Sequence, residues 1–284
     1  MKHDRKIKIL CDGGLGNRIA GLLGGLITAD RLGLEPLISW PQNNWCGAAF
    51  DDLFEPNGLL FDGQGVHDLM RSDSDDIFLL HENQTGVLLK TQMSHGRHSE
   101  LVIQTRTADV VFYTARVPEH LPITDVLRKI QQILPRHKLL TRINKFCGAH
   151  DITKNTMGLH LRKTDQMHLD EEWWYDYVQH KGANKRYFVC SDDRDTQQRF
   201  AALPNVVAYP KTHYVEKLIE GPWRQARIQD RDGRVFPNNI DRGRESVIQA
   251  WMDLLILSRT TILHTVKSSF SQTASWIAQS RGSC

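Results

Sequence analysis

The second half of the chain alternates short apolar runs with helix-length segments, and this alternation leaves few possible folds. The sequence predicts strands at 156–161, 186–190, 206–209 and 261–264, and helices over 170–180, 193–202, 242–258 and 269–281. Strands separated by helices of this length pair in parallel and form a sheet with helices on its faces. This half of the chain is therefore expected to be a parallel α/β lobe.

The first half opens in a similar way and then becomes irregular. A strand at 6–11, a Gly-rich turn at 12–17, a helix over 18–32 that ends at Gly33, and a strand at 36–40 form a β–α–β opening. Four short β-like runs follow, at 77–80, 87–90, 101–104 and 110–113, before a long helix predicted over 123–147.

We expect an α/β protein with two lobes. The predicted domains are residues 1–150 and 151–284, with the boundary near 149–155. Residues 210–241 read as a long loop within the second lobe.

Composition narrows the class of protein. With 284 residues, 40% hydrophobic, 24% charged and a net charge of +3, the chain is neither disordered nor coiled-coil, and its charge is too mild to indicate a nucleic-acid partner. No apolar run approaches 18 residues, so no integral membrane segment is expected, although peripheral membrane contact stays open. The five scattered cysteines indicate neither a disulfide framework nor a zinc site, and they favour a cytoplasmic location.

Polar or Gly-rich turns follow four of the predicted strands, at the ends where open parallel sheets bind their ligands. These turns cover residues 12–18, 162–165, 191–193 and 266–271. The first turn is not a dinucleotide fingerprint, because Ile19 stands where the third glycine would be, and it has no Gly-Lys-Ser/Thr ending of a P-loop. Together, the four turns predict one crevice that binds a diphosphate. Each turn by itself could equally be a tight connection between a strand and a helix, with no ligand.

Residues 160–165, His-Leu-Arg-Lys-Thr-Asp, carry the most specific chemistry. In a strand His160 and Arg162 share one face, while Leu161 turns to the core. Arg162 offers a planar fork to phosphate oxygens, and Lys163 adds a second positive charge. Of Asp192 and Asp193, one suffices to cap the next helix, so we expect the other to accept from a base or a ribose.

Taken in order, these segments resemble the fucosyltransferase superfamily that includes the rhizobial nodulation and mammalian core α1,6-fucosyltransferases and the protein O-fucosyltransferases. The matching segments are 13–18, 160–165, 188–193 and 269–271. The resemblance implies a GT-B-like α/β fold, with two Rossmann-like lobes whose parallel sheets face each other across a cleft. It also implies a glycosyltransferase that inverts the anomeric carbon, uses GDP-fucose as its donor substrate and needs no metal ion or other cofactor. Its acceptor would be a glycan or a lipid- or protein-linked glycan.

The resemblance also implies roles for individual residues. Arg162 would hold the β-phosphate, and Asp170 occupies the position of a candidate catalytic carboxylate, with His168, Glu171 and Glu172 as rivals. The expected acceptor contacts are Trp173 and Trp174, and the loop at 210–241, with Lys211, is expected to act as a mobile lid over the diphosphate. The expected donor contacts are Gly14, Gly16, Asn17, Arg18, His160, Lys163, Asp192, Asp193, Ser268, Ser269, Phe270, Ser271 and Gln272.

Two positions depart from the family pattern. Lys163 stands where the family has a second arginine, and Gln166 where a basic residue usually follows Thr-Asp. GDP-mannose, GDP-rhamnose or another donor therefore stays open, as does a non-catalytic protein that binds nucleotides or glycans. The expected location is the bacterial cytoplasm, including the inner membrane surface.

Overall fold

The chain divides into two compact units in the computed structural model. The first comprises Met1–Pro41 and Ala49–Leu134, and the second comprises Gln42–Ala48 and Pro135–Cys284. The division falls after Leu134, earlier than the boundary near residue 150 that the sequence predicts. The structure describes residues 6–55, 59–62, 77–82, 88–91, 101–105, 110–113, 121–164, 170–229, 235–263, 265 and 268–282.

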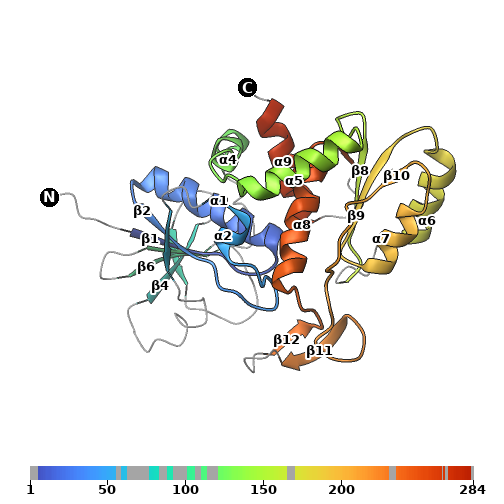
Figure 1. The fold of residues 1–284 in the computed structure, drawn as a ribbon. Helices are drawn as coiled ribbons and strands as arrows, with labels where there is room; N and C mark the ends of the chain where they lie inside the picture. Colours follow the sequence, from blue (N-terminus) through green and yellow to red (C-terminus); the bar gives the residue numbers. More distant parts are fainter. Residues whose placement is uncertain are drawn as a thin grey trace. The chain divides into compact units, whose positions relative to one another are not determined.

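The first unit is built on a seven-stranded sheet of order β3-β2-β1-β7-β6-β4-β5 (Figure 1). Strands β3, β2, β1 and β7 are parallel, whereas β6, β4 and β5 run antiparallel to their neighbours. Its elements are β1 (Lys6–Leu10), α1 (Leu15–Leu32), β2 (Glu35–Ser39), α2 (Phe50–Leu53), β3 (Leu60–Asp62), β4 (Ile77–Glu82), β5 (Leu88–Thr91), β6 (Leu101–Thr105), β7 (Val110–Tyr113) and α4 (Ile123–Ile130). The predicted α/β class is confirmed, but this sheet is mixed rather than purely parallel.

Helix α1 lies close against β1 because a glycine faces the strand. A Cβ at Gly25 would stand 2.5 Å from Cγ2 of Ile9, so only glycine allows this approach. Gly33 ends the helix with a left-handed φ of 63°, as the sequence predicts. The helix begins at Leu15 instead of residue 18, because Gly14 takes the N-cap position inside the Gly-rich turn.

The single helix predicted over 123–147 is two helices, α4 and α5 (His137–Ala149). Pro135 lacks a backbone N–H and disfavours helical conformation in the residue before it, so the helix stops although the apolar spacing continues. The break at Leu134 and Pro135 is also the place where the chain passes from the first unit to the second.

The second unit contains a four-stranded parallel sheet of order β10-β9-β8-β13. In Figure 1, α6 and α7 cover one side of this sheet and α8 and α5 the other. Besides α5, its elements are β8 (Met157–Leu161), α6 (Glu171–Asp176), a π-helical turn η1 (Tyr177–Lys181), β9 (Tyr187–Ser191), α7 (Arg194–Ala201), β10 (Val206–Val207), β11 (Arg224–Gln229), β12 (Val235–Asn238), α8 (Arg244–Leu257), β13 (Thr261–Leu263) and α9 (Ser269–Gly282). The segment predicted as a long loop therefore contains an antiparallel strand pair, β11 and β12.

Both sheets have a point where the order of the strands reverses. In the first unit β1 lies between β2 and β7, and in the second β8 lies between β9 and β13. Open parallel sheets bind ligands beyond the carboxyl ends of the strands at such a reversal. The Gly-rich turn follows β1 and residues 162–164 follow β8, so the topology singles out two of the predicted turns.

Candidate functional site

The carboxyl end of β8 is bound to the segment that leads into α9. His160 is only 5% exposed, and its Nδ1 lies 2.9 Å from Oγ of Ser271. The imidazole also stacks on the ring of Phe270, with centroids 4.4 Å apart and planes 27° apart. The hydroxyl of Thr265 donates to the carbonyl of His160. Three of the predicted donor residues thus form one packed cluster that fixes the start of α9 beside the end of β8.

Arg162 and the first turn of α9 lie at this junction. Arg162 is half-buried and directly follows β8. At the start of α9, Oγ of Ser268 accepts the N–H of Phe270 at 3.1 Å, and Gln272 donates its N–H to the carbonyl of Ser268 at 3.0 Å. The N–H groups of a first helical turn point outward and favour anions. A guanidinium beside such a turn is a suitable arrangement for binding a diphosphate.

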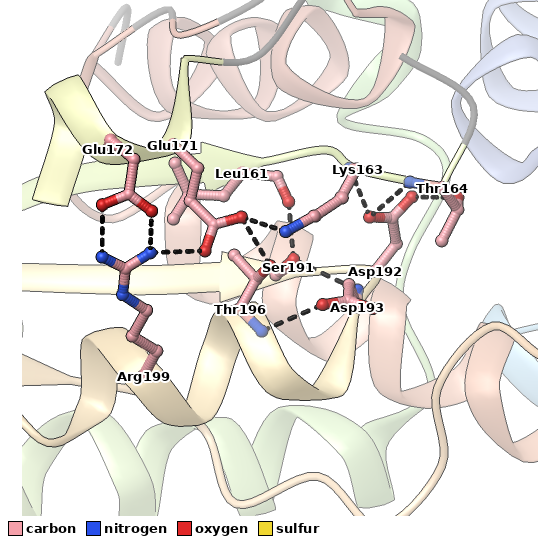
Figure 2. Close-up of polar contacts among 10 residues, drawn as sticks. All are labelled: Leu161, Lys163, Thr164, Glu171, Glu172, Ser191, Asp192, Asp193, Thr196 and Arg199. Atoms are coloured by element: carbon pink, nitrogen blue, oxygen red, sulfur yellow. Dashed lines mark hydrogen bonds and ion pairs between the residues drawn. The ribbon is translucent and has the colours of Figure 1, made fainter. Parts of the chain in front are cut away.

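The turn after β9 binds the turn after β8 (Figure 2). The carboxylate of Asp192 accepts the N–H of Lys163 at 2.8 Å and the hydroxyl of Thr164. The hydroxyl of Ser191 donates to the carbonyl of Leu161 at 2.7 Å. These bonds join the ends of the two neighbouring strands.

The neighbouring carboxylate, Asp193, is the N-cap of α7. It accepts the N–H of Thr196 at 2.9 Å, as expected for an aspartate in front of a helix. In this structure Asp192 holds the β8 turn and Asp193 caps the helix, so both aspartates have structural contacts, and the expected contact of one of them with a base or ribose stays a prediction.

Lys163 points away from the junction of β8 and α9. Its ammonium pairs with Glu171 at the start of α6 (Figure 2). Side chains alternate along an extended segment, so Lys163 projects to the side opposite Arg162. The structure thus corrects the expectation that both basic residues face the donor, and it gives Lys163 a partner on the α6 and α7 side of the sheet.

Glu171 and Glu172 share the guanidinium of Arg199. Glu171 accepts from Arg199 at 3.2 Å and from the hydroxyl of Thr196 at 3.1 Å, while Glu172 forms a two-bond pair with Arg199 at 2.5 and 2.6 Å. The hydrogen bonds from Arg199 lower the pKa of Glu172. Both rival carboxylates are thus held by cations, and His168 lies outside the described residues.

Asp170 is exposed and caps α6. Its carboxylate accepts the N–H of Trp173 at 2.9 Å. The indole of Trp173 is 48% exposed and stacks on Tyr177, with centroids 5.3 Å apart and planes 13° apart. Trp174 instead packs against the core cluster around Leu159. Of the two predicted acceptor residues, Trp173 is the more exposed.

The Gly-rich turn of the first unit is held from inside by Arg18. This side chain is 0% exposed, and it donates to the carbonyl of Gly13 at 2.7 Å and to that of Pro41 at 2.5 Å. Its guanidinium also lies over the ring of Trp40, at 5.3 Å from the centroid. Arg18 therefore stabilises the turn and does not face a ligand, which corrects its predicted role as a donor contact.

The glycines of this turn differ in what they require. Gly13 has a left-handed φ of 78°, whereas Gly14 has an ordinary φ of −72° and open space around the position of a Cβ. Gly16 is buried, and Asn17 is half-buried beside Gly13. Gly14 is thus the one of these three glycines that combines an ordinary backbone conformation with room for a ligand.

The sequence analysis missed a buried ion pair behind the end of β9. Lys211 and Asp253 are 4% and 2% exposed, with Nζ and Oδ2 2.7 Å apart, and Lys211 also donates to the carbonyl of Ser191. Lys211 is therefore an anchor, not part of the lid expected for this segment. Asp253 is a carboxylate within the buried, otherwise largely apolar stretch of α8. A charged residue in such a stretch is the sequence feature that could have predicted a buried ion pair.

Burial and mutual attraction have opposite effects on the pKa values of Lys211 and Asp253. Burial raises the pKa of Asp253 to about 6 against the attraction of Lys211. For Lys211 burial acts to lower the pKa, but the nearby carboxylate outweighs it and the net pKa is raised. Although both pKa values move upward, the short contact favours an ionised pair at neutral pH. Oδ1 of Asp253 has no hydrogen-bond partner among the described residues.

Other predicted features concern the chain as a whole. Cys11, Cys46, Cys147 and Cys190 are buried and form no disulfide within the described ranges. Within the described ranges, no group of three or more His, Cys, Asp or Glu side chains is placed to hold a metal ion. No helix in the same ranges combines the length and hydropathy that crossing a bilayer requires.

Comparison with solved structures finds similarity over almost the whole chain. Fucosyltransferase NodZ from Bradyrhizobium matches with a TM-score of 0.58 and 16% identity, over 96% of this chain and 92% of that one. NodZ alpha-1,6-fucosyltransferase co-crystallized with GDP gives 0.57 and 16% over the same shares, and the crystals soaked with GDP-fucose give 0.54 and 15% over 97% and 93%. No protein-family model and no curated protein sequence matches the chain.

The likeness extends through both units, so the strand reversals beside β1 and β8 belong to an architecture that NodZ shares. At this level of identity the similarity concerns the fold, which is the one expected from the four ordered motifs. The chain has a fucosyltransferase-like α/β fold.

Proposed function

We propose that this protein is an inverting, metal-independent glycosyltransferase that transfers fucose from GDP-fucose to a hydroxyl group of a glycan or glycoconjugate. The observation that carries the proposal is the junction of β8 and α9. There the contact of His160 with Ser271 fixes the first turn of α9 beside the end of β8 at a strand reversal, and Arg162 is the first residue after that strand. The similar fold of NodZ, solved with GDP and with GDP-fucose, supports a nucleotide-sugar donor at this junction.

The junction provides what the departing nucleotide needs. When the bond between the anomeric carbon and the β-phosphate oxygen breaks, its electron pair stays on that oxygen and adds negative charge to the diphosphate. Arg162 and the outward N–H groups of α9 would stabilise this charge, and each such donor contributes about 3 kcal/mol in a transition state. In this proposal, the cation and the helix start take the place of a metal ion.

In this proposal the acceptor binds at the start of α6. Asp170 would take the proton of the attacking hydroxyl, which approaches the anomeric carbon from the face opposite the diphosphate. Trp173 lies one helical turn from Asp170, and its exposed indole offers a flat surface to a sugar ring. Trp174 would support this surface from the core rather than bind the acceptor.

The donor sugar is the least constrained part of the proposal. Lys163 differs from the family's second arginine, and its ammonium binds Glu171 on the far side of the strand end. GDP-mannose and GDP-rhamnose are therefore tested beside GDP-fucose. A bacterial cytoplasmic location, including the inner membrane surface, completes the proposal, and the free cysteines of the described chain support it.

Calorimetric titration with GDP, together with GDP release from each of the three donors, tests the proposal. We expect GDP to bind and GDP-fucose to turn over, with Arg162→Ala abolishing turnover. Arg186→Ala, an arginine of the same unit whose side chain is 43% exposed, is the matched control and should resemble the wild type. GDP binding without turnover of any donor over hours would show a nucleotide-binding protein without catalysis, and failure to bind GDP would overturn the proposal.

A further inference from the structure

Glu171 lies where the chain enters α6, beside the proposed base. We propose that Glu171 is a positioning residue, which fixes the start of α6 and thereby the carboxylate of Asp170. This inference rests on the proposed function for one point, the catalytic role of Asp170. The contacts of Glu171 are observed in the structure and do not depend on that role. Glu171 touches neither the donor site nor a reacting atom.

The first observation is that the chain is bound to the β9–α7 turn on both sides of residues 165–169 (Figure 2). On one side, the carboxylate of Asp192 binds the N–H of Lys163 and the hydroxyl of Thr164. On the other side, Glu171 accepts from Thr196 and Arg199 of α7. The ion pair of Lys163 with Glu171 then joins the two sides directly.

The second observation is the contrast between Glu171 and its neighbour. The side chain of Glu171 is 13% exposed, and it receives bonds from the β8 turn and from two residues of α7. The side chain of Glu172 is 77% exposed and pairs with Arg199. A partly buried carboxylate with several donors holds its position more firmly than an exposed ion pair, which solvent and salt screen.

The third observation is that α6 cannot fix its own start. It has six residues, and isolated helices of this length are not stable in water. Tertiary contacts must therefore place it, and Glu171 is its first residue. Asp170 precedes Glu171 directly and is tied to the same turn by the N–H of Trp173. A movement of Glu171 is transmitted to Asp170 through a single peptide unit.

Loss of this positioning should affect the chemical step and not donor binding. A misplacement of about 1 Å at a catalytic group can cost roughly 100-fold in rate. Arg162 and the start of α9 have no described contact with Glu171, so GDP affinity should be retained. This separation distinguishes positioning of Asp170 from a general loss of structure.

The test uses Glu171→Gln, which keeps the shape of the side chain and removes its charge. We expect kcat with GDP-fucose to fall 10- to 100-fold, while the KM for GDP-fucose and the Kd for GDP stay within twofold. The amide of Trp173 should exchange its hydrogen at least fivefold faster, because its acceptor, Asp170, is less well placed. Glu171→Asp should restore part of kcat, since it returns the charge with a shorter side chain.

Lys163→Met is a second variant that breaks the same pair from the other side, and it should also speed exchange of the Trp173 amide. Glu245→Gln, an exposed carboxylate paired with Arg244 at the start of α8, is the control and should leave kcat and exchange unchanged. Glu172→Gln removes only contacts to Arg199 and should have a smaller effect than Glu171→Gln.

Unchanged exchange of the Trp173 amide in both Glu171→Gln and Lys163→Met would overturn the positioning role. Faster exchange with kcat within twofold of the wild type would overturn its link to catalysis. If the wild type turns over no donor, the proposed function fails, and the exchange measurement still decides whether Glu171 positions Asp170.

Discussion

The two units place a turn with an arginine at the same point of their sheets, yet they use the arginine differently. In the first unit the turn after β1 encloses Arg18, which is 0% exposed and binds the carbonyls of Gly13 and Pro41. In the second unit the segment after β8 carries Arg162, which is half-buried. The same topological position thus holds a fully buried arginine in one unit and a half-buried arginine in the other.

This difference shows that topology locates a possible site but does not show that a ligand fills it. The motif around Arg18 and the motif around Arg162 both follow a strand and both lie at a reversal of strand order. What separates them is burial, since Arg18 is 0% exposed and Arg162 is half-buried. Substitutions in the two turns should therefore have opposite effects, on stability in the first unit and on activity in the second.

The largest effect is expected for Arg162→Ala. Removal of the guanidinium takes away the main positive charge at the junction of β8 and α9, and turnover of GDP-fucose should fall at least about 1,000-fold. Its thermal midpoint, measured by differential scanning fluorimetry, should stay within about 2 °C of the wild type, because the side chain is not part of the core. If Arg162→Ala turns over GDP-fucose at the wild-type rate, Arg162 has no role in activity, and the two arginines do not differ in the way proposed.

Arg18→Ala should show the reverse pattern. Two buried carbonyls lose their charged donor, so the free energy of unfolding from urea titration should fall by about 3 kcal/mol. Arg31→Ala is the matched control on the same helix, because Arg31 is 43% exposed in an ion pair with Asp125 and should contribute less than about 1 kcal/mol. If the Arg18→Ala protein is as stable as the wild type but no longer binds GDP, Arg18 is a donor contact and not a structural residue.

The buried cations of the two units should also differ in their response to pH. Arg18 donates to two carbonyls, which do not titrate, and lies 3.9 Å from a carboxylate oxygen of Asp12, whereas Lys211 binds Asp253 at 2.7 Å. Burial raises the pKa of Asp253 to about 6. A carboxyl with a raised folded-state pKa binds more protons folded than unfolded, so its contribution to stability falls as pH rises from about 4 to about 6. Between these limits the difference in unfolding free energy between wild type and Asp253→Asn should change by an amount on the order of 2 kcal/mol.

Parallel urea titrations of the two proteins at pH 4, 5, 6 and 7 measure this difference, and Arg18→Ala serves as the comparison. The destabilisation caused by Arg18→Ala should change less over this range, because the hydrogen bonds of Arg18 to carbonyls do not titrate. A constant difference for Asp253→Asn as well would show that Asp253 titrates normally in the folded protein.

The adjacent tryptophans of α6 repeat the contrast on a smaller scale. Trp173 is 48% exposed, so Trp173→Ala should leave stability unchanged and raise the acceptor KM about 10-fold. Trp174 packs against the core cluster, so Trp174→Ala should lower the free energy of unfolding by about 2 kcal/mol. Equal losses of stability in the two variants would contradict the assignment of Trp173 to a binding surface.

The smallest effects are expected in the Gly-rich turn. Gly13→Ala should cost about 1 kcal/mol of stability, because residue 13 has a φ of 78°. Gly14→Ala should change stability by less than about 0.5 kcal/mol, because its φ is ordinary and the space around it is open. If Gly14→Ala also leaves donor turnover unchanged, Gly14 is not a donor contact.

The order of strands and helices could be read from the sequence because it depends on local patterns. The β-like runs of the first half are strands β4 to β7, and the alternation of the second half gives its parallel sheet. The break at Pro135 also had a local cause that outweighs apolar spacing. The mixed pairing of β4, β5 and β6 depends on long-range contacts, which periodicity does not reveal.

The residues of the site could be located but not assigned partners from the sequence. His160, Arg162 and Ser271 were expected near each other, and the structure brings their elements together. The destination of a long charged side chain depends on which carboxylate lies within reach. Lys163 therefore points to Glu171, and Lys211 to Asp253, although each was expected to face the diphosphate.

The segment Gln42–Ala48 belongs to the second unit, although in the sequence it lies between the two parts of the first unit. It is bound there by main-chain pairs, since Gly47 donates to the carbonyl of Arg242 and Arg242 donates to that of Asn44, both at 2.8 Å. During synthesis on the ribosome, these residues emerge almost 200 positions before their partners. The second unit therefore cannot be completed by its contiguous 135–284 portion alone, and a protein cut or expressed at residue 135 would lack an early-made piece of its own domain.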